Sequence, residues 1–184
     1  MDVLKTEVIP ALRTAVQMYT MDRDVIAQEA QAEKPSRAAW IIFGVSSVAM
    51  GLGAFGLVGI IMAPLSLYAS VWVMDRVAQT QGGKPRLQTL LHCYALLSAA
   101  YAIGIIPRVG VFLALLVTLW GFVILATVVQ EVYSLPADRA IKCVLGMIVA
   151  MVVTMGAVSM VVSTVQIRAQ RDADVQRAKP VTDE

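Results

Sequence analysis

The sequence has very few of the residues that build catalytic and metal sites. It contains one histidine, His92, and two cysteines, Cys93 and Cys143, which fall in different hydrophobic segments. Zinc motifs, paired catalytic histidines and a disulfide framework are therefore excluded within this chain. The two thiols are interpreted as small buried hydrophobic side chains. We expect no catalytic residue, no metal site and no cofactor.

Charged residues are also scarce. They make up 15% of the 184 residues, whereas 58% are hydrophobic and the mean hydropathy is +0.72. A soluble domain of this length could not cover its surface with so few polar groups, so the composition predicts a membrane protein. The formal net charge of +2 is too small to indicate a nucleic-acid partner, and the basic residues form no stripe.

Long apolar runs predict five membrane spans. No charged residue lies between Arg37 and Asp75, a stretch that would be about 55 Å long as one helix, whereas the hydrocarbon core is about 30 Å thick. The glycine-rich sequence 51–56 predicts a reversal between two spans; the alternative is one span plus a re-entrant segment. The expected spans are 36–51, 56–74, 87–106, 111–129 and 140–165.

The residues before the first span predict short helices. Apolar residues recur at helical spacing from Val8 to Tyr19, Pro10 suits a first turn, and Asp22 suits the N-cap of a second helix. We expect an amphipathic cytoplasmic helix that packs under the bundle, lies on the membrane surface or binds a partner. The fold class is an all-α polytopic bundle with a cytoplasmic segment (1–36), a five-span domain (37–166) and a polar tail (167–184).

Lysine and arginine are concentrated on one side of this topology. The N-terminal segment and the two loops on its side carry ten of them, against five on the other side, four of which lie in the tail. Short loops rich in lysine and arginine stay in the cytoplasm. The N-terminus is therefore expected in the cytoplasm and the C-terminus outside.

The same topology gathers polar residues from distant parts of the chain at the cytoplasmic face. We call this end of the expected bundle the rim, and its residues could dock a partner, form the mouth of a pathway or simply anchor helix ends in water. No charged residue lies near the middle of a span, which argues against an ion-coupled transporter. The candidate rim residues are Asp75, Arg76, Gly82, Gly83, His92, Tyr94, Glu131 and Arg139.

Four short segments occur in a recognisable order: 81–88 (QGGKPRLQ), 94–97 (YALL), 105–107 (IIP) and 135–140 (LPADRA). With the N-terminal helix, the hairpin of two spans and the tryptophan-bearing fourth span, they resemble the Ypt-interacting-protein (Yip) domain family over most of the chain. Eukaryotic members carry an acidic Asp-Leu-Tyr-Gly-Pro element and are linked to Rab-type GTPases. That element is absent here, so a GTPase partner is not carried over, and the chain resembles the small prokaryotic members.

The resemblance implies a non-enzymatic integral protein of a bacterial inner (plasma) membrane. Such a protein would organise or bind other membrane proteins or lipids through the cytoplasmic rim. The expected partners are membrane lipids and either another membrane protein or a second copy of the chain, with no nucleic acid. The alternative is a passive channel, carrier or lipid-handling membrane protein.

Overall fold

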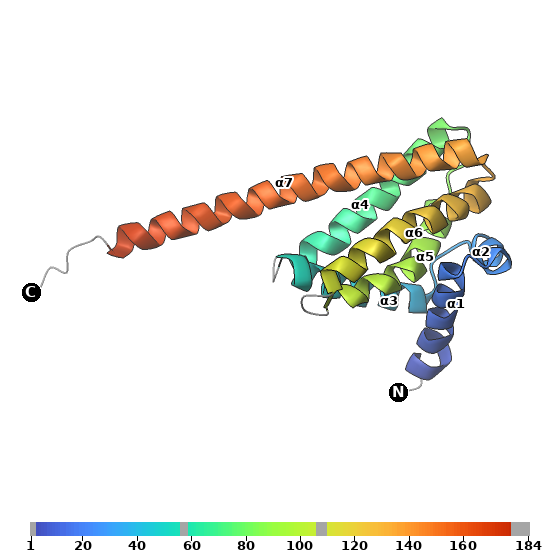
Figure 1. Cartoon of the computed structure of the whole chain (residues 1–184), viewed down its shortest axis with the longest axis horizontal. Helices are drawn as coiled ribbons and strands as arrows, with labels where there is room; N and C mark the ends of the chain where they lie inside the picture. The colour runs from blue at the N-terminus through green and yellow to red at the C-terminus, as the bar shows by residue number, and fades with distance from the viewer. Residues whose placement is uncertain (1–2, 56–58, 106–109, 178–184) are drawn as a thin grey trace, which may run out of the picture.

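The computed structural model describes residues 3–55, 59–105 and 110–177, and the regular structure in these ranges is all helical, as predicted. Figure 1 shows a helix bundle with one long helix projecting from it. A π-helical turn, η1 (Leu4–Val8), opens the chain. It is followed by α1 (Ile9–Tyr19), α2 (Arg23–Glu29), α3 (Arg37–Phe55), α4 (Gly59–Thr80), α5 (Leu87–Leu97), the 3-10 helix η3 (Ser98–Ile105), α6 (Gly110–Tyr133) and α7 (Ala137–Arg177).

Five helical segments form a closed ring. Helix α3 packs against α4, α4 against α7, and α7 against α6, while α6 and α3 both pack against η3, which continues α5. Helix α7 approaches α4 closely at Gly146, where an added Cβ would lie 3.1 Å from Val77. The interior is filled with buried side chains that include Leu67, Val71, Met74, Ile124, Val128 and Met147.

The two predicted N-terminal helices are confirmed. Pro10 lies in the first turn of α1, and the Asp22 carboxylate caps α2 by accepting hydrogen bonds from the backbone N–H groups of Asp24 (3.2 Å) and Val25 (3.3 Å). Helix α1 runs across the bundle, whereas the ring helices run along it (Figure 1). Both short helices contact α5 and α6.

The first predicted hairpin has longer helices than expected. Helix α3 continues through Gly51 and Gly53 to Phe55, so the reversal predicted within 51–56 does not occur at 51–55, and residues 56–58 lie outside the described residues. A glycine inside a helix costs about 1 kcal/mol, but an unpaired backbone group in an apolar environment costs several. Continuing the helix is therefore the cheaper solution. Helix α4 likewise extends past the predicted end at Met74 to Thr80.

The third predicted segment is not one α-helix. It begins at Leu87 as expected, but changes to a 3-10 helix at Ser98, whose hydroxyl donates to the Ala95 carbonyl (2.7 Å). At the same point the Tyr19 hydroxyl donates to the Leu97 carbonyl (2.9 Å). Burial and the neighbouring Tyr101 raise the pKa of the Tyr19 hydroxyl, so it remains protonated as a donor.

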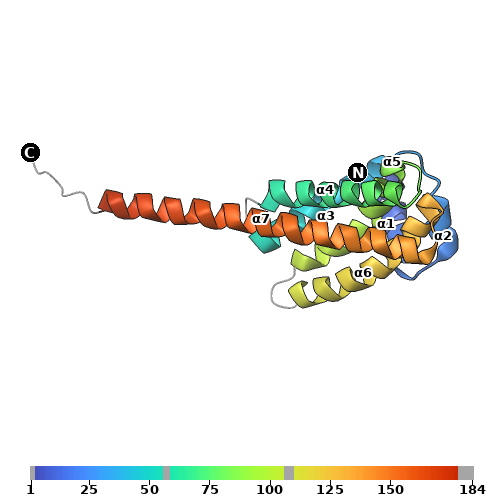
Figure 2. The ribbon, with the colours of Figure 1, turned by 90° about the horizontal axis from the view of Figure 1, so that it is seen from above.

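Helix α7 is far longer than the others. Its 41 residues correspond to about 60 Å, whereas the 22 residues of α4 correspond to about 33 Å. It runs through the predicted polar tail as far as Arg177 and projects beyond the bundle (Figure 2). Among the described residues, one segment, Leu116–Tyr133, has both the length and the hydropathy needed to cross a membrane, and Arg37–Ala49 is a shorter apolar helix.

Three helices end in the same way. After α1, α4 and α6, a residue with positive φ reverses the chain: Met21 (61°), Gly82 (98°) and Ser134 (51°). This is the Schellman arrangement, in which the next N–H reaches back to a carbonyl in the last turn. The bonds are Asp22 N to Gln17 O (3.2 Å), Gly83 N to Ala78 O (3.0 Å) and Leu135 N to Gln130 O (3.2 Å).

We predict that Ser134→Gly stabilises the protein. Ser134 is exposed, and a left-handed conformation costs a residue with a Cβ about 1 kcal/mol that glycine avoids. The midpoint of thermal unfolding in detergent should therefore rise. Ser134→Ala is the matched control and should give no rise; equal midpoints for the two variants would contradict the assigned conformation.

Candidate interaction site at the rim

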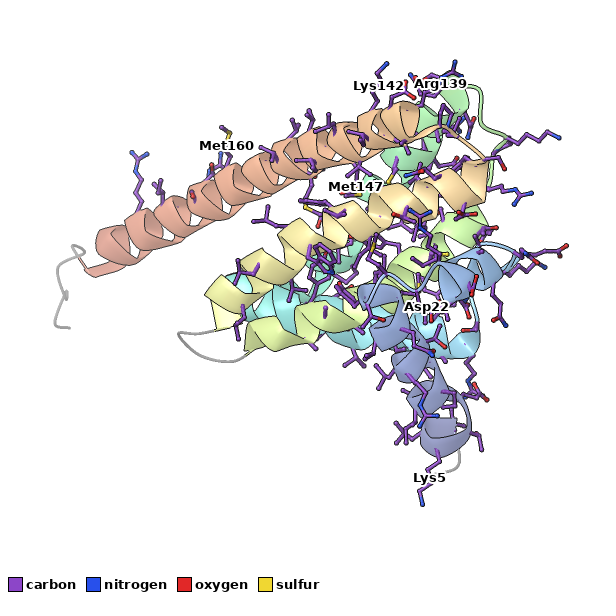
Figure 3. The ribbon with its side chains drawn as sticks, turned by 45° about the vertical axis from the view of Figure 1, so that its right-hand side comes forward. Lys5, Asp22, Arg139, Lys142, Met147 and Met160 are labelled. Atoms are coloured by element: carbon purple, nitrogen blue, oxygen red, sulfur yellow. The ribbon has the colours of Figure 1, made fainter. Side chains whose placement is uncertain are left out.

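The rim exists as a structural unit. The C-terminal ends of α4 and α6, the N-terminal ends of α5 and α7, and α2 all lie at the same end of the bundle (Figures 1 and 3). Figure 3 shows Arg139 and Lys142 at this end, on the first turns of α7. The antiparallel packing of successive helices therefore brings together residues that are far apart in sequence.

Asp75 is the centre of a buried polar cluster. Its side chain is 3% exposed, and its Oδ1 accepts hydrogen bonds from the Tyr133 hydroxyl (2.5 Å) and the Arg86 backbone N–H (3.1 Å). Its Oδ2 accepts one from the Gln79 amide (2.6 Å). We call these four residues the carboxylate cluster. It joins α4, α6 and the loop before α5, so Asp75 holds the rim together and does not face a partner.

The two glycines of the loop make this cluster possible. Gly82 supplies the positive φ that ends α4. Gly83 lies against Tyr133, where an added Cβ would be 2.9 Å from a ring carbon and 3.1 Å from the Ala78 carbonyl oxygen. Arg139 donates from Nη1 to the Gln81 carbonyl (2.9 Å) and ties the start of α7 to the same loop. The glycine pair thus permits close packing.

His92 is the buried member of a second polar cluster. The ring is 5% exposed; its Nδ1 accepts a hydrogen bond from the Ser36 backbone N–H (3.3 Å), and its Nε2 lies 2.6 Å from the Glu29 carboxylate. Because Nδ1 is the acceptor, we assign the proton to Nε2, which donates to Glu29. These three residues are the histidine cluster. It fastens α2 and the linker before α3 to α5.

The eight candidate rim residues therefore fall into two groups. Tyr94 is buried beside Tyr101, and with Asp75 and His92 it serves the interior. Arg76 is exposed and lies over the Trp72 ring, 5.2 Å from its centroid. Gly83 is partly buried against Tyr133 and belongs with the interior group, and those with exposed surface are Arg76, Gly82, Glu131 and Arg139.

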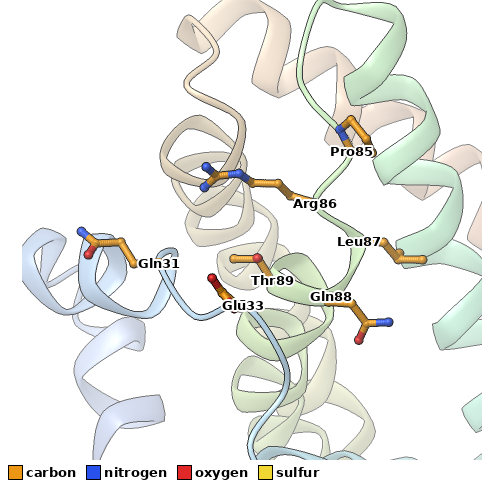
Figure 4. A pocket seen from close by; sticks show the side chains of 7 residues that line it. All are labelled: Gln31, Glu33, Pro85, Arg86, Leu87, Gln88 and Thr89. Atoms are coloured by element: carbon orange, nitrogen blue, oxygen red, sulfur yellow. The ribbon is translucent and has the colours of Figure 1, made fainter.

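A pocket opens on the rim between the two clusters. Its volume is about 620 Å³, and Figure 4 shows its side chains on facing segments, the linker after α2 and the start of α5. One wall is fixed by the Arg86 N–H bond to Asp75 and the other by the Ser36 bond to His92. The lining residues are Gln31, Glu33, Pro85, Arg86, Leu87, Gln88 and Thr89.

None of these lining residues was among the candidates selected from sequence. Arg86 and Gln88 belong to the segment 81–88 that carries the family resemblance, but they were not selected as rim contacts, and Gln31 and Glu33 lie in no recognised motif. The available signal was their position, because both segments flank residues that the topology placed at the rim. Glu29, the partner of His92, gave no local signal either, since the two lie 63 residues apart.

We predict that Tyr133→Phe destabilises the bundle. Removing the hydroxyl leaves a buried carboxylate with one donor fewer, and a hydrogen bond to a charged group contributes about 1.5–3 kcal/mol. Thermal unfolding in detergent should show a lower midpoint for this variant. Tyr68→Phe, at an exposed tyrosine of α4, is the control and should change little. In an Asp75→Asn background the loss should be smaller, and full additivity of the two changes would contradict the cluster.

Comparison with known proteins completes the description. Residues 17–160, which include the carboxylate cluster, the histidine cluster and the ring helices up to the middle of α7, match the family profile described as the Yip1 domain. Searches of curated proteins and of solved structures gave no match. Because the match covers most of the chain, the resemblance seen in the sequence is confirmed. The chain belongs to the Yip1 domain family.

Proposed function

We propose that this Yip-type membrane protein is a non-enzymatic, five-span protein of a bacterial inner membrane that binds another membrane protein through its rim. The observation that carries the proposal is the rim pocket, whose two walls are held by separate polar clusters. Pockets that are formed before a ligand arrives lose less entropy on binding. The rim is thus suited to recognition.

The outer surface of the ring supports the five-span arrangement. Large apolar side chains point outward on α3, α4, α6 and α7, and soluble proteins rarely expose so much contiguous apolar surface. Lipid acyl chains would cover this surface and remove the free-energy cost of exposing apolar side chains to water. The outward residues include Val45, Ile61, Leu65, Leu116, Leu119, Val123, Leu145 and Val149.

Helix length is consistent with the same arrangement. At 1.5 Å per residue, α3, α4 and α6 measure about 28, 33 and 36 Å, close to the hydrocarbon thickness of about 30 Å. The α5–η3 segment is comparable, because a 3-10 helix rises about 2 Å per residue. Helix α7 exceeds this thickness and would extend from the membrane on the side opposite the rim.

The pocket lining suits a peptide segment of a partner. Glu33 and Arg86 supply one acidic and one basic group, Gln31 and Gln88 supply amides, and Thr89 supplies a hydroxyl. Such a mixture can pair with the N–H and C=O groups of an extended backbone and with side chains of either charge. We therefore propose a cytoplasmic segment of a membrane protein, or of a second copy, as the occupant. A GTPase is not part of this proposal.

A photocrosslinking residue tests this directly. Placed at Gln88 in the pocket, it should give a crosslinked adduct of defined mass in native membranes, because a bound segment would lie within reach. The matched control is Asp138, which is exposed on the same rim but outside the pocket lining. Arg86→Gln should abolish the adduct while keeping the backbone N–H bond to Asp75, and the unfolding midpoint of this variant shows whether the fold is retained.

Two outcomes would contradict the proposal. One is the same adducts from Gln88 and Asp138, which would indicate random collisions. The other is no adduct from Gln88, together with solute flux through the purified protein in liposomes, which would favour the channel or carrier alternative.

A further inference from the structure

Helix α1 has three distinct faces. Val8, at its N-cap, and Ala15 and Met18 on the helix are buried against the bundle. At about 100° per residue, the neighbouring face carries Ile9, Leu12 and Val16, which are 54%, 41% and 64% exposed. The remaining face is polar, with Arg13 and Gln17. A helix on a water-facing surface would normally be polar over its whole outer side. We call Ile9, Leu12 and Val16 the outer stripe.

Each backbone carbonyl in the last turn of α1 accepts a hydrogen bond from a donor in the protein. The last four carbonyls of a helix have no partner within it, and at a water-exposed end water can serve them. Here the Val16 and Gln17 carbonyls accept from the Thr20 N–H, and the Met18 carbonyl accepts from the Met21 N–H. The Tyr19 carbonyl accepts from the Trp120 indole N–H (3.0 Å). A helix end in a lipid environment requires such a protein donor for every backbone carbonyl, because no water is present there.

The same contacts place this helix end level with the outward apolar side chains of the ring helices, which we call the apolar belt. Trp120 lies 13 positions before Tyr133, about 20 Å along α6 from the rim, and inside the segment Leu116–Tyr133. The Tyr19 hydroxyl bonds to Leu97, at the far end of α5 from the rim. Helix α2 then leads back to the rim, where Glu29 meets His92.

Orientation completes the placement. Figure 1 shows α1 crossing the direction of the ring helices, so α1 would lie roughly in the plane of a membrane that the ring spans. Figure 3 shows Lys5 at its free end, away from the bundle, and Asp22 at the attached end. Amphipathic helices that lie along a membrane place their apolar side in the acyl chains.

We propose that α1 is an in-plane membrane helix whose outer stripe contacts lipid acyl chains. Of the placements that the sequence left open for this helix, the proposal selects the membrane, and it rests on the membrane placement proposed above. Lipid is the occupant that fits, because the outer stripe is bordered by a polar face along the helix and α1 is joined to the exposed Trp120 of the apolar belt.

Site-directed fluorescence quenching in liposomes tests the proposal. Bimane is attached at Leu12→Cys or Val16→Cys on the outer stripe, and at Arg13→Cys or Gln17→Cys on the polar face as matched controls. Native Cys93 and Cys143 are buried, and the unsubstituted protein provides the blank. Doxyl lipids, with the quencher on the acyl chain, should quench most of the stripe fluorescence, and aqueous iodide should quench mainly the controls.

Leu119→Cys on α6 separates the two proposals. If doxyl lipids quench bimane at Leu119 but not at Leu12 or Val16, the inference about α1 is overturned and the membrane placement stands. If Leu119 is not quenched, the membrane placement itself fails. Stripe labels that neither quencher reaches would show that protein covers the stripe; recovery of doxyl quenching on diluting the protein in lipid would identify a second copy as that cover. Either result would overturn the lipid contact.

Discussion

Polar groups inside an apolar bundle must find partners within the protein, and the described structure is organised around this constraint. Asp75 has three donors, His92 has one donor and one acceptor, and the carbonyls of Leu97 and Tyr19 accept side-chain hydrogen bonds. An unpaired buried group would cost a few kcal/mol, which is a large share of the stability of a small domain. Each of these bonds also joins segments that are distant in sequence. Satisfying the polar groups therefore positions the helices.

The constraint explains why the rim differs from the rest of the bundle. At the rim, helix ends expose carbonyls and loops turn, so polar side chains are needed to complete the bonds. The carboxylate cluster secures one loop and the histidine cluster secures one linker, leaving a preformed pocket between them. Elsewhere the outer surface is apolar and suited to lipid. Recognition is thus concentrated where the architecture already requires polar residues.

Local signals in the sequence predicted local structure well. Asp22 as an N-cap, Pro10 in a first turn and the start of α5 at Leu87 all depend on neighbouring residues and were confirmed. Membership of the Yip1 domain family followed from the order of short motifs. The predicted end of α3 was wrong. Glycine marks turns more reliably in water than in an apolar environment, where breaking a helix leaves unpaired backbone groups and costs more free energy.

The candidate site was only partly predictable. Topology correctly indicated that Asp75, Gly82, Gly83, His92 and Arg139 would meet at one end of the bundle. It could not indicate that Asp75 pairs with Tyr133 or His92 with Glu29, which lie 58 and 63 residues away. Those pairings depend on the depth and rotation of each helix, which packing decides. Asp75, His92 and Tyr94, which were chosen as contacts for a partner, are buried supports of the bundle. The pocket lies beside them.

The central claim is that the ring spans a membrane five times with its rim in the cytoplasm. An odd number of spans places the two termini on opposite sides, so alkaline phosphatase fused after Glu184 should be active outside the cytoplasm. The same reporter fused after Lys84, in the rim loop, should be inactive. Inactive phosphatase after Glu184, with a cytoplasmic fluorescent reporter active at the same point, would contradict the account and require an even number of spans.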